Sequence, residues 1–135
     1  MIKPAFAGLA VTLLLAACSQ GGGDSAGQGA YAGLEKEILD WRADLETHHV
    51  ACRNKVEGKG CESFEVTCKA AQEIGQDEIA KGVTAKVVAA MRFNGRNADG
   101  SSGKPGSAFA LFSKTGGTWT RTEAKPVNMS SCAPL

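Results

Sequence analysis

Apolar residues recur at steps of three and four between residues 34 and 52, a spacing that predicts an amphipathic α-helix with one buried stripe. Acidic side chains crowd the first turns of this segment, where they suit the helix dipole. The glycines at positions 58 and 60 end the pattern. We expect the stripe to face the core, and its members are Leu34, Ile38, Trp41, Leu45 and Cys52, with one of His48 and His49 between them.

The stretch from Ser63 to about residue 80 predicts a second helix, for which Ser63 is the expected N-cap. Phe64, Cys68, Ala71 and Gly75 fall on one face of it at helical spacing. Small side chains on that face would allow close packing against the first helix or against a sheet. We therefore expect the two helices to form a hairpin.

After Gly82 the period of the hydrophobic pattern changes from about 3.6 to about 2, which predicts β-strands. The glycine-rich stretch 94–106 is typical of a polar loop, and Gly116-Gly117 is typical of a tight hairpin turn. We expect three strands that follow one another along the chain, at residues 83–93, 107–114 and 118–125.

The order of these elements predicts an α+β fold in which an N-terminal helical hairpin packs on a three-stranded antiparallel β-meander. Residues 32–135 would make up this single small domain. The residues before it, 18–31, are rich in glycine and serine, a composition typical of a flexible tether. A domain of this size has a modest core, so disulfides would stabilise it.

Four of the five cysteines fall inside the predicted domain, an even number that is typical of two disulfides in an exported protein. We favour Cys52–Cys61, which would close the connection between the helices, and Cys68–Cys132, which would tie the C-terminal tail to the core. The alternative is a zinc site. The spacings C-x8-C and C-x6-C do not match the close cysteine pairs of usual zinc sites, so we expect no metal.

The chain begins with a basic residue, Lys3, and an apolar run over residues 5–15 that is too short to span a bilayer as a helix. The run ends in Leu15-Ala16-Ala17-Cys18, which resembles the lipobox of bacterial lipoproteins. The resemblance implies that residues 1–17 are a signal peptide that is removed. It also implies that Cys18 becomes the lipid-carrying N-terminus.

The residue after the lipidated cysteine bears on location. Ser19 is similar to the residues that accompany outer-membrane sorting in Gram-negative lipoproteins, where aspartate tends to signal inner-membrane retention. The resemblance therefore implies a protein of the bacterial cell envelope, anchored by lipid to the outer membrane and facing the periplasm.

Without the predicted signal peptide, basic and acidic side chains balance at 14 each, which argues against a nucleic-acid partner. The charges are unevenly placed: residues 34–79 carry 11 acidic and 6 basic side chains, and residues 80–135 carry 2 acidic and 8 basic. Ordinary solvated faces explain this imbalance, and a positive face for an anionic partner is the alternative. The candidate contact residues on the sheet are Lys86, Arg92, Trp119 and Arg121.

His48 and His49 are the obvious candidates for metal binding or acid–base chemistry. Adjacent helical residues point about 100° apart, so the two imidazoles would not line one site. Asp44 lies four residues before His48, but such pairs are common on helix surfaces. No set of nucleophile, base and oxyanion donor can be assembled from the sequence, so we expect neither an enzyme nor a bound cofactor.

The segment from Phe109 to Arg121 resembles the strand–glycine–tryptophan–strand hairpin that closes many cystatin-like or NTF2-like domains. We expect a non-enzymatic interaction or structural module, held at the membrane by its lipid, that binds an envelope protein or an anionic partner at its sheet face. The alternative is a small-ligand binder with a cavity between helices and sheet, lined by Trp41, Met91 and Phe109. The sequence does not define the oligomeric state.

Overall fold

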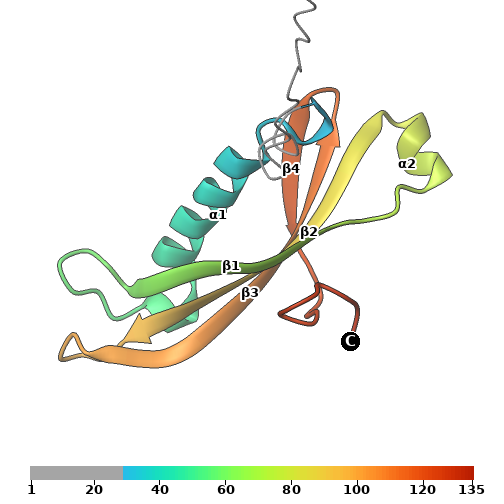
Figure 1. Ribbon diagram of the computed structural model, residues 1–135. Helices are drawn as coiled ribbons and strands as arrows, with labels where there is room; N and C mark the ends of the chain where they lie inside the picture. The colour runs from blue at the N-terminus through green and yellow to red at the C-terminus, as the bar shows by residue number, and fades with distance from the viewer. Residues whose placement is uncertain (1–28) are drawn as a thin grey trace, which may run out of the picture.

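The computed structural model describes residues 29–135, and the lipobox, Cys18 and the predicted tether up to residue 28 lie outside the described residues. The α+β class is confirmed, but one long helix and four strands replace the expected two helices and three strands (Figure 1). The elements are the 3₁₀ turn η2 (Gly29–Tyr31), α1 (Leu34–His48), the 3₁₀ turn η3 (Val50–Cys52), β1 (Cys61–Ala71), the short helix α2 (Gln76–Ala80), β2 (Val83–Arg96), β3 (Ser102–Thr115) and β4 (Thr118–Glu123).

The four strands form one antiparallel meander in the order β1-β2-β3-β4. β2 and β3 have 14 residues each and pair along almost their whole length, so they form the central hairpin of the sheet. Gly116 and Gly117 both have positive φ and connect β3 to β4 as the expected two-residue turn. β4 is short, and it pairs with β3 only from Ala110 to Thr115.

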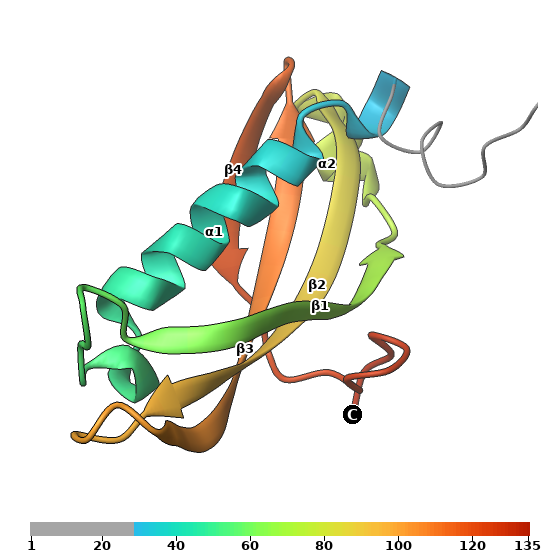
Figure 2. The same cartoon turned by 60° about the vertical axis from the view of Figure 1, so that its left-hand side comes forward.

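α1 lies across one face of the sheet, and Leu34, Ile38, Trp41 and Leu45 of the predicted apolar stripe are buried there (Figure 2). The helix ends at His48, so Cys52, the last member of the stripe, is buried in η3 instead, and neither histidine is buried. The edge of the Trp41 indole meets the ring of Phe112 on β3, with the centroids 5.7 Å apart, so Trp41 is a core residue as expected. Successive side chains of a strand point to opposite faces, and alternate residues of β2 therefore meet the helix. These residues are Val87, Ala89, Met91 and Phe93.

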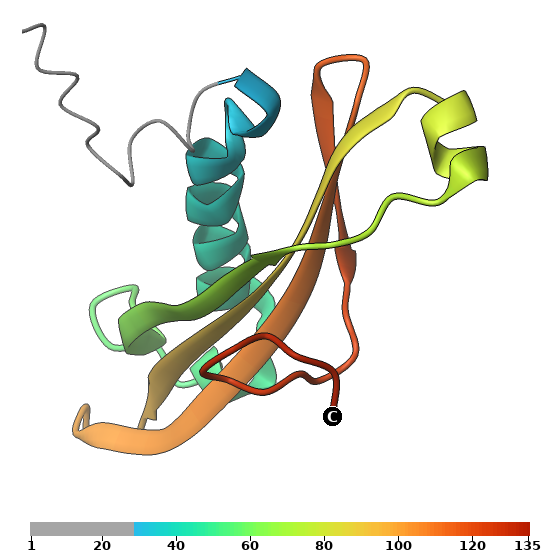
Figure 3. The same cartoon turned by 45° about the vertical axis from the view of Figure 1, so that its right-hand side comes forward.

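The C-terminal tail covers the opposite face of the sheet, which it crosses after β4 (Figure 3). The other alternate residues of β2, Val88 and Ala90, are buried there together with Cys132. A single helix covers only one face of a sheet, so the tail supplies the second apolar layer. Half-buried side chains from β3 and from the tail complete that layer: Phe109, Leu111, Val127 and Met129.

The predicted helix from Ser63 to residue 80 is wrong, because this stretch forms strand β1 and then the five-residue helix α2. Ser63 lies within β1 with a φ of +57° and is no N-cap. The pairing of β1 with β2 shifts register twice, between Glu62 and Glu65 and between Val66 and Cys68. Each shift interrupts the two-residue alternation, so the apolar residues of β1 imitate helical spacing.

The stretch 94–106, predicted as a loop, is mostly strand. β2 continues to Arg96 and β3 begins at Ser102, which leaves residues 97–101 as the connection. Backbone pairing holds this end of the hairpin, beyond the last buried ring of β2 at Phe93. The side chains at this end of the hairpin cover no core, so apolar and polar residues do not alternate in this part of the sequence.

Two disulfides join the described cysteines in the favoured pairing, Cys52–Cys61 and Cys68–Cys132. The first closes the connection from η3 to β1, rather than a connection between two helices. The second ties the tail to β1 over a sequence separation of 64 residues. In the chain-entropy account, a cross-link stabilises a fold more as the loop that it closes grows longer.

We predict that the Cys68–Cys132 bond contributes more to stability than the Cys52–Cys61 bond, because it closes a loop of 64 residues rather than 9. Loop-closure entropy gives about 4 kcal/mol for the longer loop and about 2.5 kcal/mol for the shorter one. Urea unfolding of C68A/C132A and of C52A/C61A measures the difference. An equal or larger loss in C52A/C61A would show that packing around the fully buried Cys52 outweighs chain entropy.

Candidate functional site

The four predicted contact residues do not share one surface. Lys86 and Arg92 alternate with the helix-facing residues of β2, so they lie on the face that the tail crosses. Trp119 packs into the cluster beneath α1, and Arg121 pairs with Asp44 of that helix. The expected contact surface is thus divided between two sides of the sheet.

Each of these residues also has a partner inside the domain. Lys86 Nζ lies 3.0 Å from Glu78 Oε1 of α2. The Arg92 guanidinium pairs with Glu65 of β1. Together with the pair that Arg121 makes, these contacts join neighbouring elements and use the positive charges within the fold.

Trp119 connects β4 with the start of α1. Its indole Nε1 donates a hydrogen bond to the backbone oxygen of Ala32 at 2.8 Å. Gly33, the N-cap of α1, has a φ of +91°, and a Cβ on it would lie 3.2 Å from that indole nitrogen. Glycine therefore serves both the left-handed backbone and the close ring contact. These contacts make Trp119 a packing residue.

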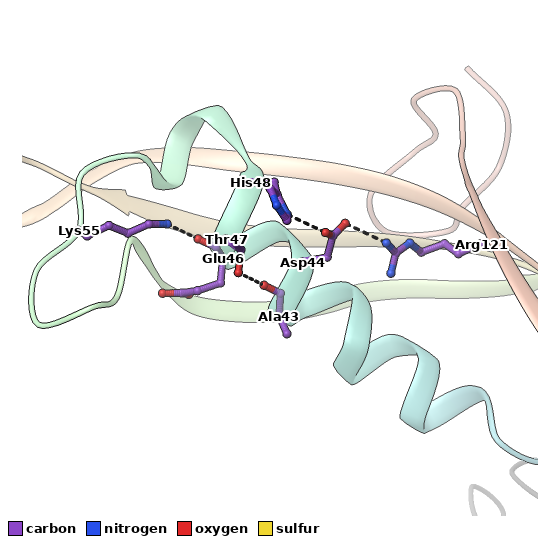
Figure 4. A network of polar contacts seen from close by, with 7 residues as sticks. All are labelled: Ala43, Asp44, Glu46, Thr47, His48, Lys55 and Arg121. Carbon is purple, nitrogen blue, oxygen red and sulfur yellow. Dashed lines mark hydrogen bonds and ion pairs between the residues drawn. The ribbon is translucent and has the colours of Figure 1, made fainter.

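A polar network runs along the last turns of α1 (Figure 4). Asp44 accepts hydrogen bonds from His48 Nδ1 and from Arg121 Nη2, each at 2.8 Å. Lys55 donates to the backbone oxygen of Glu46 and holds the segment after η3 against the helix. The His48 side chain is 73% exposed, so in this network it faces water, as expected for one of the two histidines.

A cleft of about 420 Å³ opens between the end of α1 and the edge of β3 and β4, and Asp44, His49 and Ser107 all line it. These are the residue types of a hydrolytic triad. However, His49 Nδ1 accepts a hydrogen bond from the Ala51 N–H at 3.1 Å, so the proton of the neutral ring is on Nε2. A protonated Nε2 cannot take the proton of a serine hydroxyl. Asp44 is already bound by its two partners in Figure 4, so the three residues form no relay.

The expected cavity lined by Trp41, Met91 and Phe109 is not formed by these residues. Met91 is 1% exposed and fills the core beneath α1. Phe109 packs in the cluster on the opposite face, because it alternates with the helix-facing Ala108 and Ala110. Trp41 and Phe109 both border the 420 Å³ cleft, but Met91 does not.

A second cleft, of about 390 Å³, lies where η3 meets the far end of the β2–β3 hairpin. Three cations from three segments line it: Arg53 after η3, Arg96 at the end of β2 and Lys104 in β3. None of the described side chains that line it is acidic. We name it the basic cleft, and its remaining lining residues are Val50, Ala51, Asn54, Gly95, Asn97 and Pro105.

The basic cleft depends on the close approach of η3 to β2. A Cβ on Gly95 would lie 2.4 Å from the Ala51 oxygen, so only glycine allows this contact. The Asn54 Nδ2 donates to the Arg96 oxygen at 3.0 Å and ties the segment after η3 to the end of β2. The Cys52–Cys61 disulfide fixes the same segment to β1. One wall of the cleft is therefore held by three contacts, two with β2 and one with β1.

The three cations of the basic cleft differ in their environment. The Arg96 side chain is 18% exposed, and its Nη2 lies 3.2 Å from Glu62 Oε2. Its Nε is buried and has no hydrogen-bond partner in the described chain. Arg53 and Lys104 are exposed and form no ion pair with another described residue. The cleft thus holds one partly compensated and two uncompensated positive charges.

Sequence reasoning missed the basic cleft. Arg96 and Lys104 lie within the stretch that is predicted as a loop, and Arg53 follows the last residue of the predicted apolar stripe, Cys52, without a predicted role. The available signal was the excess of basic over acidic residues between positions 80 and 135. That excess indicates a positive face, but it does not identify which basic residues form the cleft.

Within residues 29–135, no group of three or more His, Cys, Asp or Glu side chains could hold a metal ion. No helix in this part of the chain is long and apolar enough to cross a membrane. Comparisons with models of known protein families, with curated proteins and with solved structures gave no match. The functional argument for this chain therefore depends on its own residues.

The ion pair between Lys86 and Glu78 of α2 makes the stability of the fold depend on pH, which can be tested. The Gly75 N–H donates to Glu78 Oε2 at 2.8 Å and Lys86 pairs with the same carboxylate, so the pKa of Glu78 lies below its ordinary value of 4.5. A lowered pKa stabilises the fold above the pKa of the unfolded chain. This contribution is lost as the pH falls through the lower pKa of the folded state.

We predict that NMR titration of the Glu78 carboxyl gives a midpoint below 4.5. K86M should raise this midpoint more than the control K81M, because Lys86 donates a hydrogen bond to the carboxylate and Lys81 acts only through its charge. In both variants the Gly75 N–H still holds the midpoint down. Equal effects of the two substitutions would contradict a direct Lys86–Glu78 pair.

We predict that W119F lowers the free energy of unfolding by about 1 kcal/mol, the typical net value of one hydrogen bond. A phenyl ring fills much of the same space but cannot donate to the Ala32 oxygen. Urea unfolding monitored by circular dichroism measures the change. If stability were unaffected, the indole would be free for contacts with a partner.

Proposed function

We propose that this protein is a lipid-anchored protein of the bacterial cell envelope and that its domain is a non-enzymatic binding module. The lipobox ending at Cys18 and the Gly/Ser-rich stretch after it support the anchor. The two disulfides support an exported location, since such bonds persist in oxidising compartments. Ser19 favours the outer membrane, with the domain facing the periplasm.

The observation that carries the binding role is the position of the basic cleft relative to the start of the domain. The described chain begins at Gly29 beside the first turn of α1, and η3 follows the last turn of that helix (Figure 1). A helix of 15 residues is about 22 Å long. An anchor attached before Gly29 would therefore join the domain at the opposite end of α1 from the basic cleft, and a flexible tether would leave the cleft accessible to a partner.

The chemistry of the basic cleft suits binding. Cations attract an anionic partner and raise its rate of association, and amide side chains help to orient it. The described residues that line the cleft carry no hydroxyl, thiol, carboxylate or imidazole group. The Lys104 amine is the one lining group that could act as a base or nucleophile, and no second such group lies beside it in the described lining, so the composition supports binding rather than catalysis.

Small-ligand binding is the second candidate, and the 420 Å³ cleft favours it. Its volume falls within the range of about 300–1,000 Å³ that is usual for ligand pockets. Two aromatic residues, Trp41 and Phe109, border it. Trp41 is only 4% exposed, however, so the cleft offers a ligand little aromatic surface, and we place this candidate second.

Replacement of Cys18 by serine tests the anchor. We predict that the wild-type chain, expressed with its signal peptide in a Gram-negative host, gains the mass of a lipid modification and fractionates with the outer membrane. C18S should lack the added mass and leave the membrane fraction, whereas the control S19A should keep both. A wild-type protein without added lipid mass would overturn the anchor.

A further inference from the structure

We infer that the basic cleft binds an acidic peptide segment of a partner protein. Arg53, Arg96 and Lys104 would hold its carboxylates. This inference rests on the proposed role as a binding module and adds the chemistry of the partner. It does not depend on how the protein is anchored.

Charge complementarity favours an anionic occupant. Cations in the middle of the sheet are neutralised by carboxylates of neighbouring elements, as Arg92 is by Glu65. Arg53 and Lys104 line the same cleft as Arg96 without such a carboxylate. Like charges that are held in one cleft repel one another, and an anion between them relieves that repulsion.

Arg96 provides a second, independent observation. Its Nε is a buried donor without a partner, and buried donors are nearly always paired. Arginine binds a carboxylate most strongly through two parallel hydrogen bonds, and Nε and Nη2 form one such edge. At present Nη2 alone lies within 3.2 Å of the Glu62 carboxylate. A carboxylate in the cleft would engage both nitrogens if the Arg96 side chain turned away from Glu62.

The lining of the cleft favours a peptide over a single small anion. Its three cations come from three segments, a spread that suits several carboxylates along one chain. Asn54 and Asn97 use their amide nitrogens within the domain, so an amide oxygen of each is left to accept a peptide N–H group. Val50 beside them is 66% exposed and offers an apolar contact.

The peptide would bind through side chains rather than as an added strand. β4 pairs with β3 only from Ala110 onward, so in the described chain the edge of β3 near the cleft is open. That edge carries Pro105, which has no N–H, and the charged Lys104. Both features are typical of strand edges that are protected from pairing.

Fluorescence anisotropy tests this inference with the full-length protein in detergent. The probe is a short labelled peptide of alternating glutamate and alanine, and the control peptide carries glutamine in place of glutamate. We expect the glutamate peptide to bind at low ionic strength and to dissociate as salt is added. The glutamine peptide should not bind measurably.

Two matched pairs of variants locate the site. R53Q/K104Q should weaken binding about tenfold, and K81Q/K125Q, which removes equal charge from exposed lysines outside the cleft, should change it less than about twofold. E62Q frees the Arg96 guanidinium and should strengthen binding. E65Q removes the same charge from the Arg92 pair and should not.

Equal binding of the two peptides, or equal losses in the two double variants, would overturn the inference. Binding of inorganic phosphate without binding of the peptide would also overturn the inference, because it would identify a site for small oxyanions. A change in the thermal unfolding temperature measures phosphate binding. Either failure would leave the lipidation of Cys18 untouched. A wild-type chain without added lipid would in turn leave peptide binding intact, so the two proposals fail separately.

Discussion

The fold depends on the burial of one apolar stripe of α1 against alternate residues of the β2–β3 hairpin. That contact decides which face of each strand is interior, and it turns the remaining apolar residues of the hairpin to the opposite side. The described chain has no second long helix to cover them, so the C-terminal tail does so. A tail without regular structure loses much conformational entropy when it is ordered, and the Cys68–Cys132 bond offsets part of that loss.

The placement of charge follows from the same layout. Residues 34–79, which include α1 and β1, are acidic, and residues 80–135, which include β2, β3 and β4, are basic, so ion pairs run between elements. Such exposed pairs add little stability, but they neutralise the side chains that take part. Many of the excess charges in each half of the sequence therefore pair with one another inside the domain, and only the unpaired charges are available to a partner. The pairs that join different elements include Asp44–Arg121, Glu35–Lys69 and Glu78–Lys86.

Sequence reasoning could predict α1, the start of β2 and the turn at Gly116-Gly117, because regular periodicity and turn chemistry mark them. It could not predict β1, whose two register shifts hide the alternation of a strand, nor the far end of the hairpin, which backbone pairing holds without burial. Only residue type and strand position indicate the four candidate contact residues in the sequence. Sequence alone does not tell a paired cation from an unpaired one, because pairing depends on strand register and on where the helix lies.

The basic cleft brings two unpaired cations close to a partly paired one. Beyond Phe93 the hairpin extends past the packed core, and Arg96 and Lys104 line the basic cleft beside η3. Arg96 also borders a hollow on its other side, which Glu46 of α1 and Glu62 line. The acidic residue of that turn, Asp99, accepts hydrogen bonds from the Ser101 hydroxyl and N–H, which hold its pKa below the usual range and keep its carboxylate within the turn. Gly95 lets η3 close on β2 and so places Arg53 in the same cleft. Two unpaired cations and one partly paired cation thus meet in the basic cleft, at the opposite end of α1 from Gly29, where a molecule outside the chain can contact them.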